Sequence, residues 1–245
     1  MNNHPKSAHL IYKLNTLYLA STDLHLTMIS ERRRKIIQGT ILLISVGFVL
    51  LTLVVTFLPV NILDTSFSKE VQEHQNPLLD ITMEFISWFG YFPGSAIVVI
   101  VAAAAFFYFK YKKEALFVLI TSVSGLISTI IKAIVERPRP TDQLVRVVRK
   151  VGEESFPSGH VLFYVVFFGF LLMLMYQLKS IPRFIRLTVS VISGGLILTI
   201  PISRVYLGAH WFTDVVGGFL LGLICLYVLS YFYEKYSTAR RVPNK

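Results

Sequence analysis

The sequence has little cysteine and comparatively little negative charge. Its one cysteine, Cys225, excludes an internal disulfide, so cysteine usage says nothing about the redox compartment. Only 14 Asp and Glu stand against 24 Lys and Arg. The first 27 residues have no long apolar core and no small-residue cleavage pattern, so they do not form a convincing signal peptide. Met28 immediately precedes a basic run and is a second candidate for the start of the chain.

Apolar residues dominate the rest of the composition. They make up 54% of the chain, and the mean hydropathy of +0.62 lies well above that of a soluble domain. A helix needs about 20 residues to cross a bilayer, and six apolar runs are that long or nearly so. The runs are continuously apolar rather than alternating, which argues against a β-barrel. The sequence therefore predicts an all-α, six-span transmembrane helical bundle, with spans at 37–60, 92–110, 115–135, 161–178, 185–203 and 214–233.

The distribution of positive charge predicts the orientation of this bundle. Together with Lys110 and Arg186 at the span ends, the two termini and the segments that would share their side hold 16 of the 24 Lys and Arg, including the run at 32–35. Because cytoplasmic flanks are enriched in Lys and Arg, we expect both termini to lie in the cytoplasm. The membrane is expected to be the plasma (inner) membrane. The basic composition thus reflects topology and not nucleic-acid binding. The predicted organisation is a cytoplasmic segment at 1–36, a membrane domain at 37–233 and a basic cytoplasmic tail at 234–245.

Three short polar clusters interrupt the apolar chain at the opposite, outer side. They are KAIVERPRP at 132–140, PSGH at 157–160 and SRVYLGAHWFTD at 203–214. A phosphoryl group in transfer carries negative charge on its non-bridging oxygens, so its catalysis depends on positioning and on fixed positive charge. Arginine binds two phosphate oxygens with its planar fork, and lysine acts as a point charge. The clusters therefore predict a phosphate pocket, built from Lys132, Arg139, Arg204, His160, His210 and Asp214.

His210 and Asp214 are four residues apart, so they share a helix face if the last span begins before them. A carboxylate in that place can accept from one ring nitrogen and present the other outward, as in a hydrolase triad. The clusters hold no acidic pair and no His or Cys group at metal-ligand spacing, so we expect no metal and no other cofactor.

Eleven fixed positions of these clusters resemble the three-part signature of the type-2 phosphatidic acid phosphatase superfamily, the integral-membrane lipid phosphate phosphatases. The match lies within 92–233 and says little about 1–36 or the 61–91 segment. The resemblance implies that His210 is a nucleophile oriented by Asp214, and that His160 protonates the leaving oxygen and then helps to activate water. It further implies phosphate binding by Lys132, Arg139, Ser158, Gly159 and Arg204.

Sequence and resemblance together predict a metal-independent lipid phosphate or lipid diphosphate phosphatase at the outer membrane face. Expected substrates are polyprenyl diphosphates such as undecaprenyl diphosphate, phosphatidylglycerophosphate and phosphatidic acid. One alternative is a phosphotransferase that passes the phosphoryl group from the same histidine to a lipid or sugar hydroxyl. Another is a lipid-phosphate transporter or binding protein without chemistry, which would explain the cations but not the His210 and Asp214 pair.

Several other residues have structural interpretations. The pairs Gly194–Gly195 and Gly217–Gly218, with Gly222, are typical of close helix contacts. The phenylalanines at 163, 167, 168 and 170 indicate bundle core or a lipid-facing surface. Tyr206 and Trp211 are typical of interfacial anchors. The basic residues at 146, 149 and 150 indicate a solvated loop, with an extension of the phosphate site as the alternative.

Overall fold

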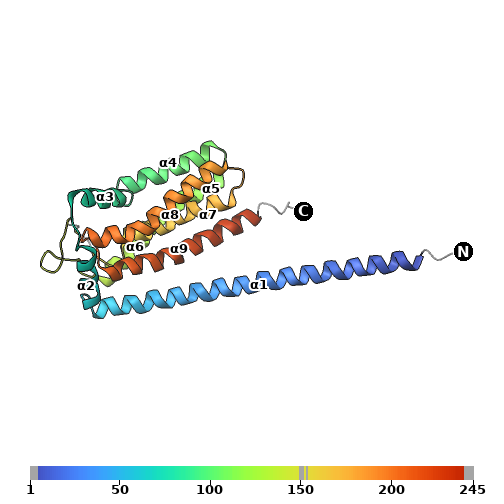
Figure 1. Cartoon of the computed structure of the whole chain (residues 1–245), viewed down its shortest axis with the longest axis horizontal. Helices are drawn as coiled ribbons and strands as arrows, with labels where there is room; N and C mark the ends of the chain where they lie inside the picture. Colours follow the sequence, from blue (N-terminus) through green and yellow to red (C-terminus); the bar gives the residue numbers. More distant parts are fainter. Residues whose placement is uncertain (1–4, 149–151, 153, 240–245) are drawn as a thin grey trace. The chain divides into compact units, whose positions relative to one another are not determined.

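The computed structural model describes residues 5–148, 152 and 154–239, and this part of the chain consists of helices and connecting segments without a strand (Figure 1). The all-α prediction is therefore confirmed. The chain divides into one compact unit that ends at Leu43 and a second that begins at Ile44. The helices are α1 (Pro5–Phe57), α2 (Ile62–Val71), α3 (Pro77–Trp88), α4 (Gly94–Tyr108), α5 (Lys112–Ile120), α6 (Val123–Val135), α7 (Gly159–Gln177), α8 (Arg183–Tyr206) and α9 (Phe212–Ala239).

The membrane spans follow the predicted runs closely. Within the described residues, five helical stretches are long and apolar enough to cross a membrane, so the chain is a multi-pass membrane protein. The remaining predicted span, 92–110, forms α4, whose 15 residues measure only about 22 Å at 1.5 Å per residue. The six-span count is therefore approximate. The five long spans are Glu31–Phe57, Lys112–Val135, Gly159–Gln177, Arg183–Tyr206 and Phe212–Tyr236.

The first unit is helical from Pro5 onward, and its side chains at 31–40 are exposed. The second unit is built around α7, which packs against α5, α6, α8 and α9. Every side chain from 161 to 171 in α7 is buried, as expected for a helix that is apolar on all sides and surrounded by others. The phenylalanine cluster of α7 therefore belongs to the bundle core.

The glycine pairs behave differently from one another. A Cβ on Gly222 of α9 would lie 2.7 Å from Val165 of α7, and one on Gly217 would come within 2.4 Å of a neighbouring ring. Gly222 therefore allows a close helix contact, between α7 and α9, as predicted, whereas Gly217 makes room for Phe156 in the segment before α7. No atom lies within 4 Å of a Cβ on Gly194 or Gly195, so the prediction of close packing is wrong for that pair.

The 61–91 segment, which lies between the first two predicted spans, forms helices α2 and α3. Asn61 caps α2 by accepting a hydrogen bond from the Asp64 amide at 2.9 Å, and Asn76 caps α3 in the same way with Leu79 at 2.8 Å. Pro77 follows Asn76 at the first helical position, where a missing N–H costs nothing. Both helices contribute side chains to the polar network described below.

Polar contacts attach the loop after α6 to α3 and α8. Arg146 forms two hydrogen bonds with the carboxylate of Asp80, at 2.9 and 2.6 Å, and the Tyr206 hydroxyl donates to the same carboxylate at 2.7 Å. Hydrogen bonding to Arg146 and Tyr206 lowers the pKa of Asp80 to about 2. Tyr206 is buried, so its assignment as an interfacial anchor is wrong. Residues 149 and 150 lie outside the described part of the chain.

Candidate active site

A cavity of about 570 Å³ gathers most of the predicted site residues. Six of the eight line it, whereas Ser158 and Asp214 are fully buried and do not. The cavity lies beside α4 and α6 and reaches the N-terminal end of α7 and the C-terminal end of α8. The six lining residues are Lys132, Arg139, Gly159, His160, Arg204 and His210.

The end of α6 aims the first cluster at the cavity. Lys132 lies in the last turn of this helix, and Glu136 ends it in the left-handed conformation with φ of 49°. The chain then continues through Pro138, which cannot extend a helix. Arg139 follows with its Nη1 donating to the Ala209 carbonyl at 2.5 Å. The same Nη1 lies 3.3 Å from Nε2 of His210, so the first and third clusters meet here.

A glycine turn folds the third cluster back on itself. Gly208 has φ of +65°, and a Cβ there would lie 2.1 Å from the Arg146 carbonyl oxygen, so only glycine fits. The turn lets the Ala209 and His210 amides donate to the carbonyl of Arg204, at 3.1 and 3.3 Å. His210 is thereby brought next to the end of α8 that carries Arg204.

Neutral oxygen atoms orient the other two cations. Arg204 is completely buried, and its Nη1 donates to the Ser87 hydroxyl at 2.9 Å and to the Tyr91 hydroxyl at 2.7 Å. Lys132 is also buried and donates from Nζ to the Glu154 carbonyl. Sequence analysis missed Ser87 and Tyr91, because nothing in the 61–91 segment marks them as partners of residues more than 100 positions away.

The imidazole of His160 packs against two residues that follow α3. A Cβ on Gly90 would lie 2.4 Å from its ring, so the imidazole packs directly on this glycine. The ring of Tyr91 stands edge-on to it with centroids 4.3 Å apart. Its Nε2 has no hydrogen-bond partner in the part of the chain that the structure describes. Tyr91 therefore contacts both an imidazole and an arginine of the cavity.

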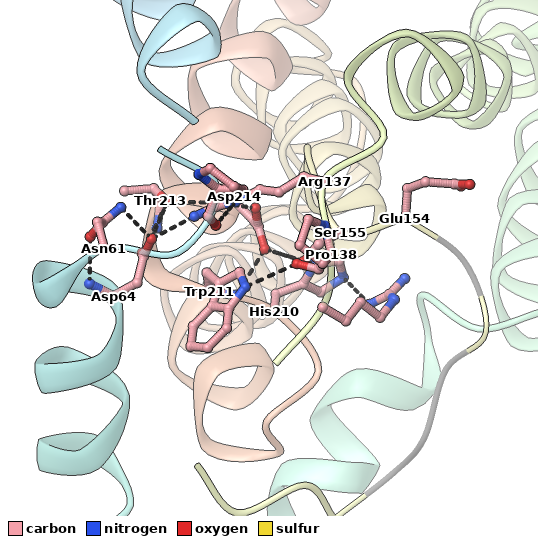
Figure 2. A network of polar contacts seen from close by, with 12 residues as sticks. Asn61, Asp64, Arg137, Pro138, Glu154, Ser155, His210, Trp211, Thr213 and Asp214 are labelled. Carbon is pink, nitrogen blue, oxygen red and sulfur yellow. Dashed lines mark hydrogen bonds and ion pairs between the residues drawn. The ribbon is translucent and has the colours of Figure 1, made fainter. Parts of the chain in front are cut away.

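His210 and Asp214 are close, but their arrangement differs from the expected shared helix face. His210 precedes the first residue of α9, and its Nδ1 lies 3.6 Å from Oδ2 of Asp214, which is longer than a hydrogen bond. That oxygen accepts from the Trp211 amide at 2.8 Å, as in a capping box, and from the Ser155 hydroxyl. Figure 2 shows the carboxylate between these donors and His210.

Arg137 is the residue that sequence analysis missed most completely. Its Nη1 donates to Asp214 at 2.5 Å, its Nη2 donates to Asp64 at 2.6 Å, and all three side chains are fully buried (Figure 2). Asp64 also accepts from the Thr213 amide at 2.8 Å, in the first turn of α9. Arg137 stands two residues before Arg139 in ERPRP, so the motif did mark it as a candidate site residue. A single sequence, however, does not assign the two arginines different tasks.

Trp211 also belongs to this buried layer. It is completely buried, and its Nε1 donates to the Pro138 carbonyl at 3.1 Å. Its assignment as an interfacial anchor is therefore wrong. Trp211 links the segment after α6 to the start of α9.

The N-termini of α7 and α9 differ in what surrounds them. The first turn of α9 is capped by two carboxylates, Asp64 and Asp214. The hydroxyl of Ser158, at the N-cap of α7, makes no capping hydrogen bond, and the next residue, Gly159, lines the cavity. First-turn amides have no partner within a helix, and the helix dipole favours anions at this end. The N-terminus of α7 therefore adds positive potential to the cavity.

The surroundings of His210 keep its imidazole neutral. Burial and the nearby cations Arg139, Arg204 and Lys132 hold the pKa of His210 well below its ordinary range. A neutral imidazole has a lone pair for attack or proton transfer. The cavity thus combines an imidazole that stays neutral with cations suited to an anionic ligand. No group of three or more metal-ligating side chains occurs among the described residues, and metal independence stays a prediction.

Comparisons with known proteins agree with the geometry. A family model described as the PAP2 superfamily matches residues 113–237. The chain is 31% identical over 187 residues to phosphatidylglycerophosphatase B of Bacillus subtilis (strain 168), covering 73% of this chain and 87% of that protein.

Two solved structures are similar to this one. The first transmembrane PAP2 type phosphatidylglycerolphosphate phosphatase from Bacillus subtilis matches with a TM-score of 0.69 and 28% identity, covering 80% of this chain and 96% of that chain. LpxE of Aquifex aeolicus matches with a TM-score of 0.56 and 21% identity, covering 70% and 96%, which shows likeness of fold.

The buried position of Arg137 predicts a large loss of stability when it is replaced. Arg137→Gln leaves two buried carboxylates without their cation, and breaking such pairs costs about 3–5 kcal/mol. Arg146 is the matched control, because its pair with Asp80 leaves 35% and 24% of the side chains exposed. Arg146→Gln should cost about 1 kcal/mol or less. Thermal unfolding in detergent measures both, and equal losses would contradict the central role of Arg137.

The cations around His210 predict a pH effect. Arg139→Gln relieves the repulsion of a protonated imidazole, so the pKa of His210 rises toward the ordinary value of about 6.5. At mildly acidic pH, more of His210 is then protonated and unreactive. Modification of His210 by diethylpyrocarbonate, followed by mass spectrometry across pH, should show its midpoint move upward. Lys112→Gln, an exposed change outside the cavity, should leave it in place. A midpoint in Arg139→Gln that stays or falls would refute the effect.

Proposed function

The chain belongs to the PAP2 superfamily and is a membrane-embedded lipid phosphate phosphatase, and from this premise we propose that it works without metal, through a phosphohistidine on His210. The observation that carries the proposal is the single cavity that joins two imidazoles to three cations. A binding protein needs the cations. It does not need a neutral imidazole beside a buried carboxylate.

In the first step, Nε2 of His210 attacks phosphorus. Nδ1 lies on the side of Asp214, so the proton on Nδ1 can point to the carboxylate and leave the lone pair on Nε2. A P–N bond forms as the P–O bond to the lipid breaks. His160, protonated when the negatively charged phosphate offsets the cavity cations, gives its proton to the departing oxygen, and Lys132, Arg139 and Arg204 bind the non-bridging oxygens. The amide of Gly159 and the hydroxyl of Ser158 assist them.

In the second step, water replaces the histidine. His160, now neutral, takes a proton from water, whose oxygen attacks phosphorus as the P–N bond breaks. Inorganic phosphate leaves and His210 is restored. Because His160 acts once as acid and once as base, it ends each cycle in its starting protonation state.

The substrates proposed are phosphatidylglycerophosphate, polyprenyl diphosphate and phosphatidic acid. The name of the Bacillus subtilis phosphatidylglycerophosphatase B supports the first of these. A cavity at the ends of membrane helices lies at the depth of lipid head groups, which suits all three.

We further propose that the enzyme lies in the plasma membrane with 37–233 as its membrane domain, and with 1–36 and 234–245 in the cytoplasm. The asymmetry of Lys and Arg supports this orientation. In this proposed orientation, the C-terminal helix ends that carry Lys132 and Arg204 and the N-terminal end that carries His160 all lie at the outer face.

A trapping experiment tests the covalent step. A brief quench with a phosphate-labelled lipid substrate, with EDTA present, should leave acid-labile, base-stable label on His210, and His210→Ala should lose both label and turnover. Asp214→Asn should fold but lose much of its activity, because the amide favours the wrong tautomer. His74→Ala is the control, since His74 is exposed and outside the cavity.

Label that persists in His210→Ala would exclude this nucleophile. Label passed to a lipid or sugar instead of released phosphate would identify a phosphotransferase.

Cysteine accessibility tests the orientation. In a Cys225→Ser background, cysteines placed at His74 or Asp142 should react with an impermeant maleimide in intact cells, because both positions are exposed near the cavity end of the bundle. A cysteine at Lys179, exposed at the other end of α7, should react only after the membrane is opened. The reverse pattern would place the active site in the cytoplasm.

A further inference from the structure

Ser128 of α6 carries a buried hydroxyl that the reaction described above does not use. The residue is 4% exposed, it lines the cavity, and its Oγ has no hydrogen-bond partner among the described residues. Serines and threonines inside helices commonly bond to a carbonyl of the preceding turn. Two neighbours on α6 do so, Ser124 to the Thr121 carbonyl at 2.7 Å and Thr129 to the Gly125 carbonyl at 3.1 Å. Ser128 is the exception on this helix, and buried hydroxyls usually have a partner.

Ser128 lies close to site residues on both α6 and α7. It stands one turn before Lys132, on the same face of α6. A Cβ on Gly159 would lie 3.0 Å from the Ser128 hydroxyl oxygen, so the two residues are in near contact. Gly159 immediately precedes His160, the acid that protonates the leaving oxygen in the proposed reaction. Ser128 is therefore close to the leaving-group side of the site.

The shape of the cavity supports the same placement. Beyond Ser128, the lining continues along α6 to Gly125 and on to Ser122 at the turn between α5 and α6. From Lys132 to Ser122 this covers roughly 15 Å of helix. Lys132 lies at one end of this stretch of α6, so the other end has room for the part of the substrate beyond its phosphate. Ser128 lies between the two.

We propose that Ser128 donates a hydrogen bond to an oxygen atom of the leaving group beside the scissile bond, and that the enzyme thereby prefers leaving groups with an acceptor in that place. This inference rests on the proposed function. The acceptor has two chemical sources: the second phosphate of a lipid diphosphate, or the hydroxyl, ester or phosphodiester oxygens of a glycerol-based lipid phosphate. A simple alkyl monophosphate has no such oxygen.

The test compares Ser128→Ala with wild type on three substrates in detergent micelles: a short-chain phosphatidylglycerophosphate, farnesyl diphosphate and dodecyl phosphate. Removing one hydrogen bond to an oxygen acceptor should lower kcat/KM about 10-fold on the substrates that supply it. On dodecyl phosphate, the change should stay below about twofold. A loss on only one of the first two substrates would identify the source of the acceptor.

Ser124→Ala is the matched control, because Ser124 is buried on the same helix, bonds within it and does not line the cavity. It should leave all three rates unchanged. Equal losses in Ser128→Ala on all three substrates would overturn the inference, since the hydroxyl would then contact the transferred phosphoryl group. No loss on any of them would overturn it as well. If the wild-type enzyme releases phosphate from none of the three substrates, the proposed function itself is refuted. Failure of the Ser128 inference and failure of the proposed function are therefore distinguishable.

Discussion

The buried guanidinium of Arg137 is the contact on which the rest of the site depends. It bridges Asp64 of α2 and Asp214 of α9, and its Nε donates to the Pro59 carbonyl at 2.8 Å. Buried carboxylates are tolerated only when they are paired and hydrogen-bonded, so the three charges require one another. Asp214, once fixed in this way, faces His210. Arg137, which does not line the cavity, thus fixes the carboxylate that lies 3.6 Å from Nδ1 of His210.

The cavity uses its positive charge for two purposes. Lys132, Arg139 and Arg204 are suited to phosphate oxygens, and the same charges disfavour a protonated His210. In the proposed reaction, a neutral imidazole is what attacks, so phosphate binding and nucleophile activation have a common electrostatic origin. The carboxylate of Asp214 is only partly compensated by Arg137, because this one guanidinium is shared between Asp214 and Asp64.

The membrane bundle explains why these groups are held rigidly. Each site cation or imidazole lies at the end of a helix or in a short segment fixed by hydrogen bonds, and α7 is anchored by contacts on every side. Small residues bring the elements together: Gly90 supports His160, and Gly208 permits the turn that carries His210. Positions set by packed helices are more precise than positions on mobile loops.

The sequence by itself determined the all-α membrane class, the approximate spans and which polar clusters meet. Long apolar runs and clusters at their ends are local patterns, and neighbouring helix ends on one side of a membrane must come close together. The sequence did not separate the tasks of Arg137 and Arg139, because both follow α6. Only the left-handed conformation of Glu136 and the packing against α2 direct Arg137 into the interior and Arg139 to the cavity. Asp64, Ser87 and Tyr91 escaped notice for a related reason: their partners are 73 or more positions away, and local periodicity carries no information about such contacts. Tertiary structure alone also decided the 3.6 Å gap between His210 and Asp214 and the unpaired hydroxyl of Ser128, since both depend on how α6, α7 and α9 pack.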